Sequence, residues 1–233
     1  MMVTKATSPP EERPRQADYA ESATSGQTQS LTPRVPGLIR VHEAAKRDPK
    51  TRFTALLHHV DVEALHRAFK RLRCSAALGV DGETVAQYRQ DLMRRLDDLH
   101  RRVHTGLYCP QPSRRTYIPK PDGGERPLGI PALEDKIVQG AVAEVLSAVY
   151  EADFLDCSHG YRPKRNAHGA LAQLEKAVMT ERVNWVLDAD LKSYFDTVDH
   201  AWLMRMLEHR IGDRRVLRLI EGWLPILGHS RGV

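Results

Sequence analysis

The segment NWVLDADLKSYFD (residues 184–196) contains the clearest pattern in this chain. It begins with apolar side chains and becomes acidic at Asp188 and Asp190, which predicts a strand over residues 184–190. Because side chains alternate along a strand, both carboxylates are expected on one face. Carboxylates at the end of a strand can hold Mg²⁺ in phosphoryl-transfer enzymes, and solvated acids at the end of a surface strand give the same pattern.

Helices are predicted on both sides of this strand, because apolar residues recur there at intervals of three and four. Asp61 and Asn166 are residue types that cap helix N-termini, and each precedes such a pattern. The predicted helices span residues 62–73, 84–104, 136–150, 167–179, 200–211 and 213–227. A single strand among them, with nothing to pair with, indicates a sheet that is interrupted midway.

A β-hairpin is predicted ahead of the helix that begins at residue 136. Two extended runs, residues 115–118 and 126–130, flank the turn-forming residues PDGG (residues 121–124). Lys120 and Arg126 lie on either side of the tip. A forked guanidinium beside a compact ammonium suits a triphosphate, and a hairpin with two solvated charges would have the same sequence.

Cations gather in two further places. The loop SHGYRPKR (residues 158–165) combines Arg162, Lys164 and Arg165 with an aromatic residue. That combination suits phosphates and a stacked base, and a plain polar loop is equally compatible with it. One face of the helix predicted over 62–73 carries four cations, which are either solvated or in contact with phosphates: Arg67, Lys70, Arg71 and Arg73.

Composition narrows the class of protein without deciding it. The chain has 233 residues, with 35 Lys and Arg against 30 Asp and Glu, so its net charge of +5 favours polyanionic partners. Its three cysteines form no C-x-x-C pair, which excludes the common zinc motifs. No apolar run approaches the roughly 20 residues of a membrane span, and the N-terminus lacks the apolar core of a signal peptide, so a cytoplasmic location is expected.

Five blocks, taken in order, resemble the reverse transcriptases of group II introns. They are GVDGET (residues 79–84), RRTYIPKPDGGERPLGIP (114–131), DKIVQ (135–139), SHGYRP (158–163) and DLKSYFDTVDH (190–200). Their order and spacing both agree with that family across roughly residues 40–225. The resemblance implies an α+β fold, namely the fingers and part of the palm of a right-hand polymerase, mostly helical with a β-hairpin and a palm strand. Residues 1–38 are expected to be a disordered leader, 39–180 the fingers region and 181–233 the truncated start of the palm.

The resemblance also implies roles for single residues. Asp190 would be a catalytic carboxylate that binds Mg²⁺ together with the backbone carbonyl of Leu191, and Phe195 would exclude a ribose 2′-hydroxyl. Lys120 and Arg126 would hold the incoming deoxynucleoside triphosphate. The expected RNA contacts are Arg114 and Arg115 in the hairpin and Arg162, Lys164 and Arg165 in the loop. The implied partners are an RNA template, a DNA primer and deoxynucleoside triphosphates.

The sequence departs from the family after its first palm block. The family's Pro-Gln-Gly stretch and the Tyr-x-Asp-Asp turn, which supplies two further carboxylates, do not occur in these 233 residues. The chain is therefore expected to be inactive by itself, and a second polypeptide could complete the palm. Two alternatives remain open, an RNA-binding fingers fragment without catalysis and a non-functional remnant whose last two helices expose apolar faces.

Overall fold

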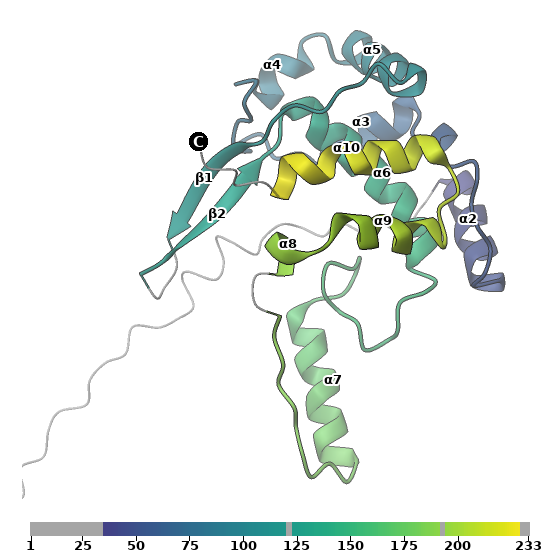
Figure 1. Cartoon of the computed structure of the whole chain (residues 1–233), viewed down its shortest axis with the longest axis vertical. Coiled ribbons are helices and arrows are strands. Elements are labelled where there is room, and N and C mark those ends of the chain that lie inside the picture. Colours follow the sequence, from purple (N-terminus) through teal and green to yellow (C-terminus); the bar gives the residue numbers. More distant parts are fainter. Residues whose placement is uncertain (1–34, 120–122, 192–193, 229–233) are drawn as a thin grey trace, which may run out of the picture.

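Most of the described chain is helical (Figure 1). The computed structural model describes residues 35–119, 123–191 and 194–228. Its helices are α2 (Pro36–Arg47), α3 (Val62–Arg71), α4 (Val85–Arg89), α5 (Leu92–Thr105), α6 (Leu133–Tyr150), α7 (Ala167–Thr180), α8 (Tyr194–Thr197), α9 (His200–Glu208) and α10 (Arg214–Gly228), with a 3₁₀ turn, η1, at Leu57–His59. Strands β1 (Arg114–Pro119) and β2 (Glu125–Ile130) form a hairpin. The predicted mostly helical α+β class is thus confirmed.

The first described helix begins slightly before the predicted end of the leader. Helix α2 begins at Pro36, so the end of the leader predicted over residues 1–38 is helical. Leu38 and Val41 on this helix are buried against α6. Residues 1–34 of the predicted leader lie outside the described residues. No helix within the described ranges is long and apolar enough to cross a bilayer.

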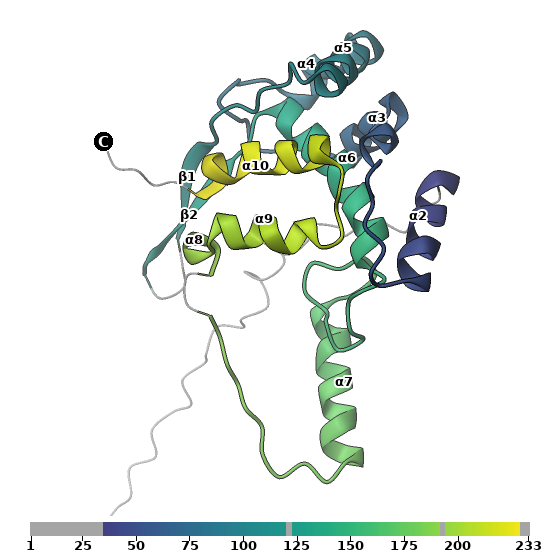
Figure 2. The same cartoon turned by 45° about the vertical axis from the view of Figure 1, so that its right-hand side comes forward.

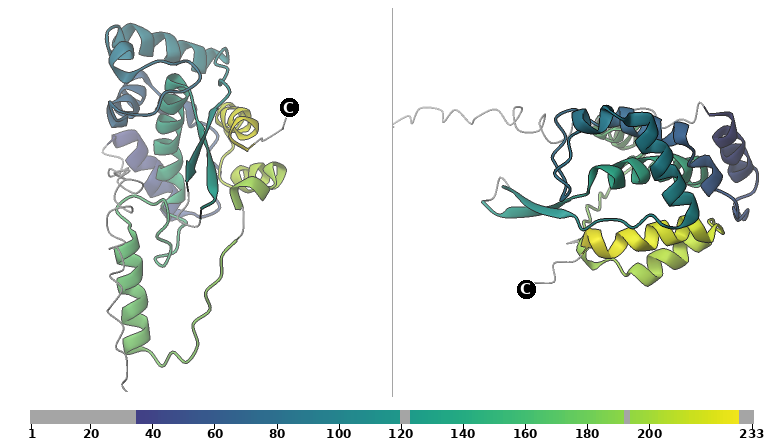
Figure 3. Two further views of the ribbon diagram at one scale, coloured as in Figure 1. Left: turned by 90° about the vertical axis from the view of Figure 1, so that its left-hand side faces the viewer. Right: turned by 90° about the horizontal axis from the view of Figure 1, so that it is seen from above.

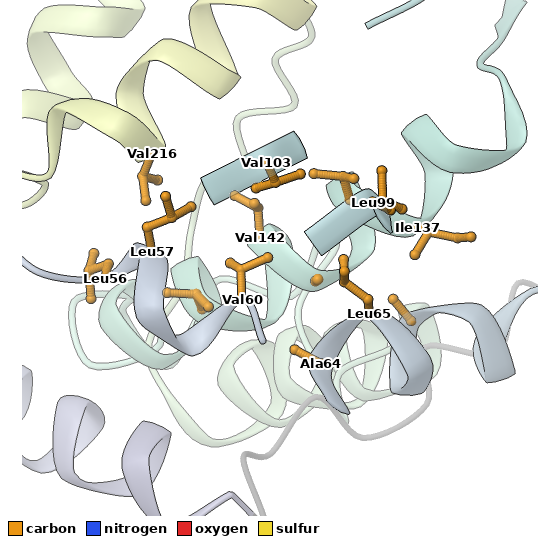
Figure 4. Close-up of a cluster of buried hydrophobic side chains, with 14 of the residues drawn as sticks. Leu56, Leu57, Val60, Ala64, Leu65, Leu99, Val103, Ile137, Val142 and Val216 are labelled. Carbon is orange, nitrogen blue, oxygen red and sulfur yellow. The ribbon is translucent and has the colours of Figure 1, made fainter. Parts of the chain in front are cut away.

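Helix α6 lies at the centre of the core because it is apolar on almost every side. Helices α2 and α3 pack along it, and α5 packs on α3. Figure 4 shows the side chains of Leu57, Leu65, Leu99, Val142 and Val216 converging from η1, α3, α5, α6 and α10. Full burial of each such side chain contributes roughly 1.5–3 kcal/mol relative to exposure. One core therefore includes residues from both the predicted fingers and the predicted palm.

Local capping explains where the helices begin. Asp61 accepts the amide of Ala64 at 2.7 Å and Asn166 accepts that of Gly169 at 2.7 Å, which confirms both predicted N-caps. The single helix predicted over residues 84–104 is wrong. Thr84 and Gln87 form a capping box for the short helix α4, and Asp91 then takes φ −119° and ψ 33°, which breaks the helix before α5.

The segment between α9 and α10 is fixed to the N-terminal part of the chain. The amide of Phe53 donates to Arg210 O at 2.8 Å, and the amide of Gly212 donates to Phe53 O at 2.7 Å. Ile211 and Trp223 are buried in the shared core. Helix α10 thus packs against the predicted fingers, and its apolar face, which the remnant hypothesis expected to be exposed, is buried at Val216 and Trp223. Helix α9 buries none of its residues and exposes Trp202 and Met206, as that hypothesis expected.

Asp213 reinforces this attachment from a buried position. Its Oδ2 accepts the amides of Leu56 at 2.8 Å and Leu57 at 2.9 Å, and Arg215 lies beside it. Burial raises the pKa of the Asp213 carboxyl, but the hydrogen bonds from the amides of Leu57, Leu56 and Arg215 and from the Arg215 side chain together outweigh burial and hold the pKa below its ordinary value of 3.8.

We expect Asp213→Asn to lower the free energy of unfolding by about 2 kcal/mol at pH 7, because the amide nitrogen that replaces Oδ1 cannot accept the hydrogen bond of the Arg215 amide, and the negative charge beside the Arg215 guanidinium is lost. The folded-state pKa is lowered, so the contribution of the carboxylate is complete above pH 3.8 and is lost as the pH falls through the folded-state pKa. Chemical denaturation of both proteins between pH 7 and pH 3 measures this. If the difference in unfolding free energy between the two proteins stayed constant from pH 7 to pH 3, the Asp213 carboxylate would not be the stabilising group.

The predicted hairpin is confirmed, and it projects from the helical body (Figure 3). Its antiparallel register runs from Arg114 opposite Ile130 to Pro119 opposite Glu125. Gly123 has φ +81°, the left-handed conformation that a tight turn assigns to glycine.

The strand predicted over residues 184–190 does not form. The segment is irregular and exposed throughout, with Trp185 and Leu187 exposed by 92% and 91%. A strand is stabilised by hydrogen bonds to a neighbouring strand, and the only ladder among the described residues joins β1 and β2. Helix α7 and the chain that returns from it extend away from the helical body together (Figure 2).

Candidate nucleic-acid interface

The two acidic side chains of the strand predicted over residues 184–190 are both solvent-exposed. Asp188 and Asp190 lie in the irregular segment that precedes α8, and Leu191 is 71% exposed. Helix α8 contains Phe195. In the described ranges no three His, Cys, Asp or Glu side chains are grouped so that they could hold a metal ion. The described residues therefore do not by themselves form the magnesium site that the resemblance implies.

The hairpin presents cations along β1. Arg114 and Arg115 are both exposed, opposite Ile130 and Gly129 of β2. Arg126 lies in β2 opposite Ile118, and Lys120 lies outside the described residues. The predicted pairing of Lys120 with Arg126 around one anion stays a prediction.

The base of the hairpin is held by the block GVDGET. Asp81 Oδ2 accepts the amide of Leu133 at 2.7 Å, and Lys136 Nζ donates to Ala77 O at 2.6 Å. A Cβ on Gly79 would lie 2.5 Å from Pro131 O, so only glycine fits this approach. This block positions the end of β2 against the start of α6.

A buried network that the sequence did not reveal holds the segment that enters β1, which is the second strand end at the base of the hairpin. Asp135 accepts the amide of Gln111 at 2.9 Å and the hydroxyl of Tyr108, and Trp223 Nε1 donates to that hydroxyl at 3.1 Å. Burial is the main reason that the pKa of Asp135 is raised, and it also raises the pKa of Tyr108. The segment that leads into β1 is thereby tied to α6 and α10. An aspartate inside an apolar helix pattern was the available signal for it.

Arg162 stabilises the loop in which it lies, contrary to the prediction that it contacts RNA. Its side chain is buried and donates to Leu155 O and Ser158 O, both at 2.8 Å, and to Glu151. The guanidinium also stacks on Phe154, with 4.9 Å from Cζ to the ring centroid. Four of its five N–H donors bind acceptors inside the protein and the side chain is buried, so Arg162 holds the loop together rather than presenting its charge to a phosphate.

The rest of this loop faces solvent in a strained conformation. Tyr161 and Lys164 have φ values of 55° and 61°, the left-handed region that costs non-glycine residues about 1 kcal/mol or more each. Tyr161 is 94% exposed and Lys164 is also exposed. Arg165 is half-buried and pairs with Asp156 at 3.1 Å. The loop thus presents an aromatic ring and a lysine, supported from within by Arg162.

The basic face of α3 is only partly available to a ligand. Arg67 and Arg71 bind the buried carboxylate of Glu144 on α6 at 3.1 and 3.2 Å. Neither the solvated nor the phosphate-bound alternative therefore applies to these two residues, because they join two helices of the core. Lys70 on the same helix is exposed.

Comparison with known proteins gives a consistent result. The profile of the reverse transcriptase (RNA-dependent DNA polymerase) family matches residues 118–232. Protein YkfC of Escherichia coli is 38% identical over 194 residues, which cover 79% of this chain and 50% of YkfC. The group II intron-encoded protein LtrA of Lactococcus lactis is 41% identical over 120 residues, which cover 51% of this chain and 20% of LtrA.

A plant protein extends the comparison. The mitochondrial nuclear intron maturase 1 of Arabidopsis thaliana is 33% identical over 99 residues, which cover 40% of this chain and 13% of the maturase. The chain thus spans half of the length of YkfC and smaller shares of the other two relatives.

Proposed function

We propose, for a chain that belongs to the group II intron type of reverse transcriptase, that it provides the fingers and the first palm block of an RNA-directed DNA polymerase. The ordered set of blocks between residues 79 and 200, together with the family match over 118–232, carries this proposal. The fold supports it, because hydrogen bonds from the neighbouring blocks hold the chain just before β1 and just after β2, at the base of the hairpin. The chain acts in the cytoplasm.

In this function the hairpin and the palm block face the reacting nucleotide. Lys120 and Arg126 hold the triphosphate of the deoxynucleotide, and Phe195 excludes the ribose 2′-hydroxyl. Asp190 and the carbonyl of Leu191 provide ligands for a divalent cation, Mg²⁺. These roles rest on the family resemblance of the residues, and the described residues do not complete a metal site.

The exposed apolar surface beyond residue 170 indicates that a further polypeptide segment completes the palm. Along the unpaired segment, alternate positions are apolar, at Val183, Trp185, Leu187 and Leu191, as in a strand that packs one face on a core. Helix α7 buries none of its residues and exposes Leu171, Leu174 and Val178. Exposed apolar surface of this extent marks an interface. The longer relatives contain further sequence that could cover it.

The RNA template is bound by exposed cations of the hairpin and the loop. We expect Arg115→Gln to weaken binding of a single-stranded RNA about 5-fold at 0.1 M salt, because one phosphate contact contributes a slope of about 0.7 to the dependence of log affinity on log salt. Fluorescence anisotropy across a salt series measures both quantities. Arg94→Gln is the matched control, since it removes one exposed arginine from α5. If both variants lost the same RNA affinity, the binding would be a general attraction by the net charge and not a contact at the hairpin.

A second candidate function is RNA binding without catalysis. The exposed cations of β1 and the loop favour it, and they need no metal site. Binding that discriminates intron RNA from random RNA of equal length, in a protein that supports no nucleotide incorporation with any partner, would select this alternative. Aggregation without a cooperative unfolding transition would instead select the remnant hypothesis.

A further inference from the structure

A groove lies between the end of α5 and the start of α10, and none of its lining residues is among those that the resemblance assigns to nucleotide or RNA binding. It has a volume of about 250 Å³ and is lined by Val103, His104, Thr105, Gly106, Tyr108, Pro110, Arg215, Arg218 and Leu219. Figures 1 and 2 both place the start of α10 at the end of that helix remote from the hairpin. The groove is therefore distinct from the cations of β1.

The charged side chains that line the groove are arginines, and contacts within the protein do not fully occupy their hydrogen-bond donors. Its lining contains two arginines, a histidine and no carboxylate. Arg215 reaches Asp213 only at 3.4 and 3.5 Å, while the amides of Leu56 and Leu57 bind that carboxylate more closely. Within the described ranges, no hydrogen bond or ion pair to Arg218 is present. Its Nη1 lies beside the end of α5, 3.8 Å from where a Cβ added to Gly106 would stand.

The end of α5 does not repel an anion as strongly as an open helix C-terminus would. A helix ends in carbonyl groups that carry partial negative charge. Here Arg101 O accepts the Thr105 hydroxyl at 2.7 Å, and Arg102 O accepts the amides of Leu107 and Tyr108. Gly106 permits this closure through its φ of +78°. The carbonyls of Arg102 and Val103 in the last turn thus have donors, and the positive charge of Arg218 beside Gly106 offsets part of the negative charge that remains at this helix end.

The floor of the groove is apolar and rigid. Val103 and Tyr108 are buried, and Leu219 on α10 is partly buried. The hydroxyl of Tyr108 is fixed between Asp135 and Trp223. A ligand that combines an anionic group with a flat or apolar body fits such a floor, because both parts find complementary surface.

We propose that this groove binds a phosphodiester of an RNA strand, with Arg218 and Arg215 on the phosphate and the apolar floor against the flat base of the attached nucleotide. The proposal rests on the proposed function, since it gives the bound RNA a second contact away from the hairpin. A phosphodiester suits the groove because Arg215 and Arg218, three residues apart on α10, both line it, and guanidinium groups bind phosphate oxygens strongly.

The test compares two arginines of α10. Arg218→Gln removes the charge that lines the groove, and Arg214→Gln removes an equally exposed charge from the same helix outside its lining. We expect Arg218→Gln to lower the affinity for a single-stranded RNA oligomer about 5-fold at 0.1 M salt and the salt slope by about 0.7, and Arg214→Gln to change affinity less than about 2-fold. Thermal unfolding of both variants should match that of the wild-type chain.

Each outcome assigns or removes the site. Equal losses in both variants, or none in Arg218→Gln, would overturn the groove as an RNA site while leaving the proposed function in place. Absence of RNA binding by the wild-type chain would instead refute the proposed function. ATP at millimolar concentration is expected not to displace the oligomer. Displacement from the wild-type chain that Arg218→Gln abolishes would assign the groove to a free nucleotide and overturn the RNA proposal.

Discussion

Primer extension by the 233-residue chain alone is expected to remain at background, and a polypeptide that carries the later palm blocks is expected to raise it. The chain contains the first palm block but no Tyr-x-Asp-Asp sequence, and its described residues do not form a metal site. The partner would supply carboxylates and would cover the apolar face of residues 183–191. Incorporation of labelled deoxynucleotide on an RNA template with Mg²⁺, measured with and without the co-expressed partner, tests this.

Asp190 and Asp188 provide the matched pair for this experiment. Both are exposed aspartates of the same segment. Asp190→Asn should return the restored activity to background, whereas Asp188→Asn should retain most of it, because the family resemblance assigns the catalytic role to Asp190 and not to Asp188. Incorporation by the pure chain without a partner, abolished by Asp190→Asn, would show that the palm is complete in this chain and would contradict the proposal.

Arg210→Met is expected to lower the free energy of unfolding by about 3 kcal/mol, because three backbone carbonyls and a carboxylate lose a charged hydrogen-bond donor. The Arg210 side chain is buried and donates to Asp153 Oδ2 at 2.9 Å, Thr51 O at 2.9 Å, Asp48 O at 3.1 Å and Ala45 O at 3.2 Å. Its loss leaves a carboxylate and three carbonyls without this donor. For a chain of this size, the expected fall in melting temperature is roughly 10 °C.

Arg205→Met in α9 is the control for this substitution. Arg205 is exposed and its described contact is with the ring of Trp202, 5.0 Å from Cζ to the centroid. Its loss should cost less than about 1 kcal/mol. Differential scanning calorimetry of the two variants makes the comparison. Similar melting temperatures for both would mean that the Arg210 contacts do not hold α9 and α10 to the N-terminal part of the chain.

The irregular segment 184–190 shows that a local sequence pattern cannot predict a strand without its pairing partner. The apolar run that becomes acidic predicted a strand there, and this was wrong because a strand also needs a neighbour to accept its hydrogen bonds. Such a partner is not encoded in the segment itself. The hairpin was predicted correctly because both of its strands and its turn lie within residues 114–130, so the pairing partner is local.

The sequence by itself determined the family, the hairpin and most of the helices, because capping residues, turn residues and apolar spacing act over a few neighbouring positions. Only the tertiary structure decided which cations remain available. Arg162 and Arg71 are used within the protein, whereas Lys164 and Arg218 face solvent. The physical reason is that a buried guanidinium must find acceptors wherever the fold places them. Those of Arg210 lie as far as 165 residues away along the chain.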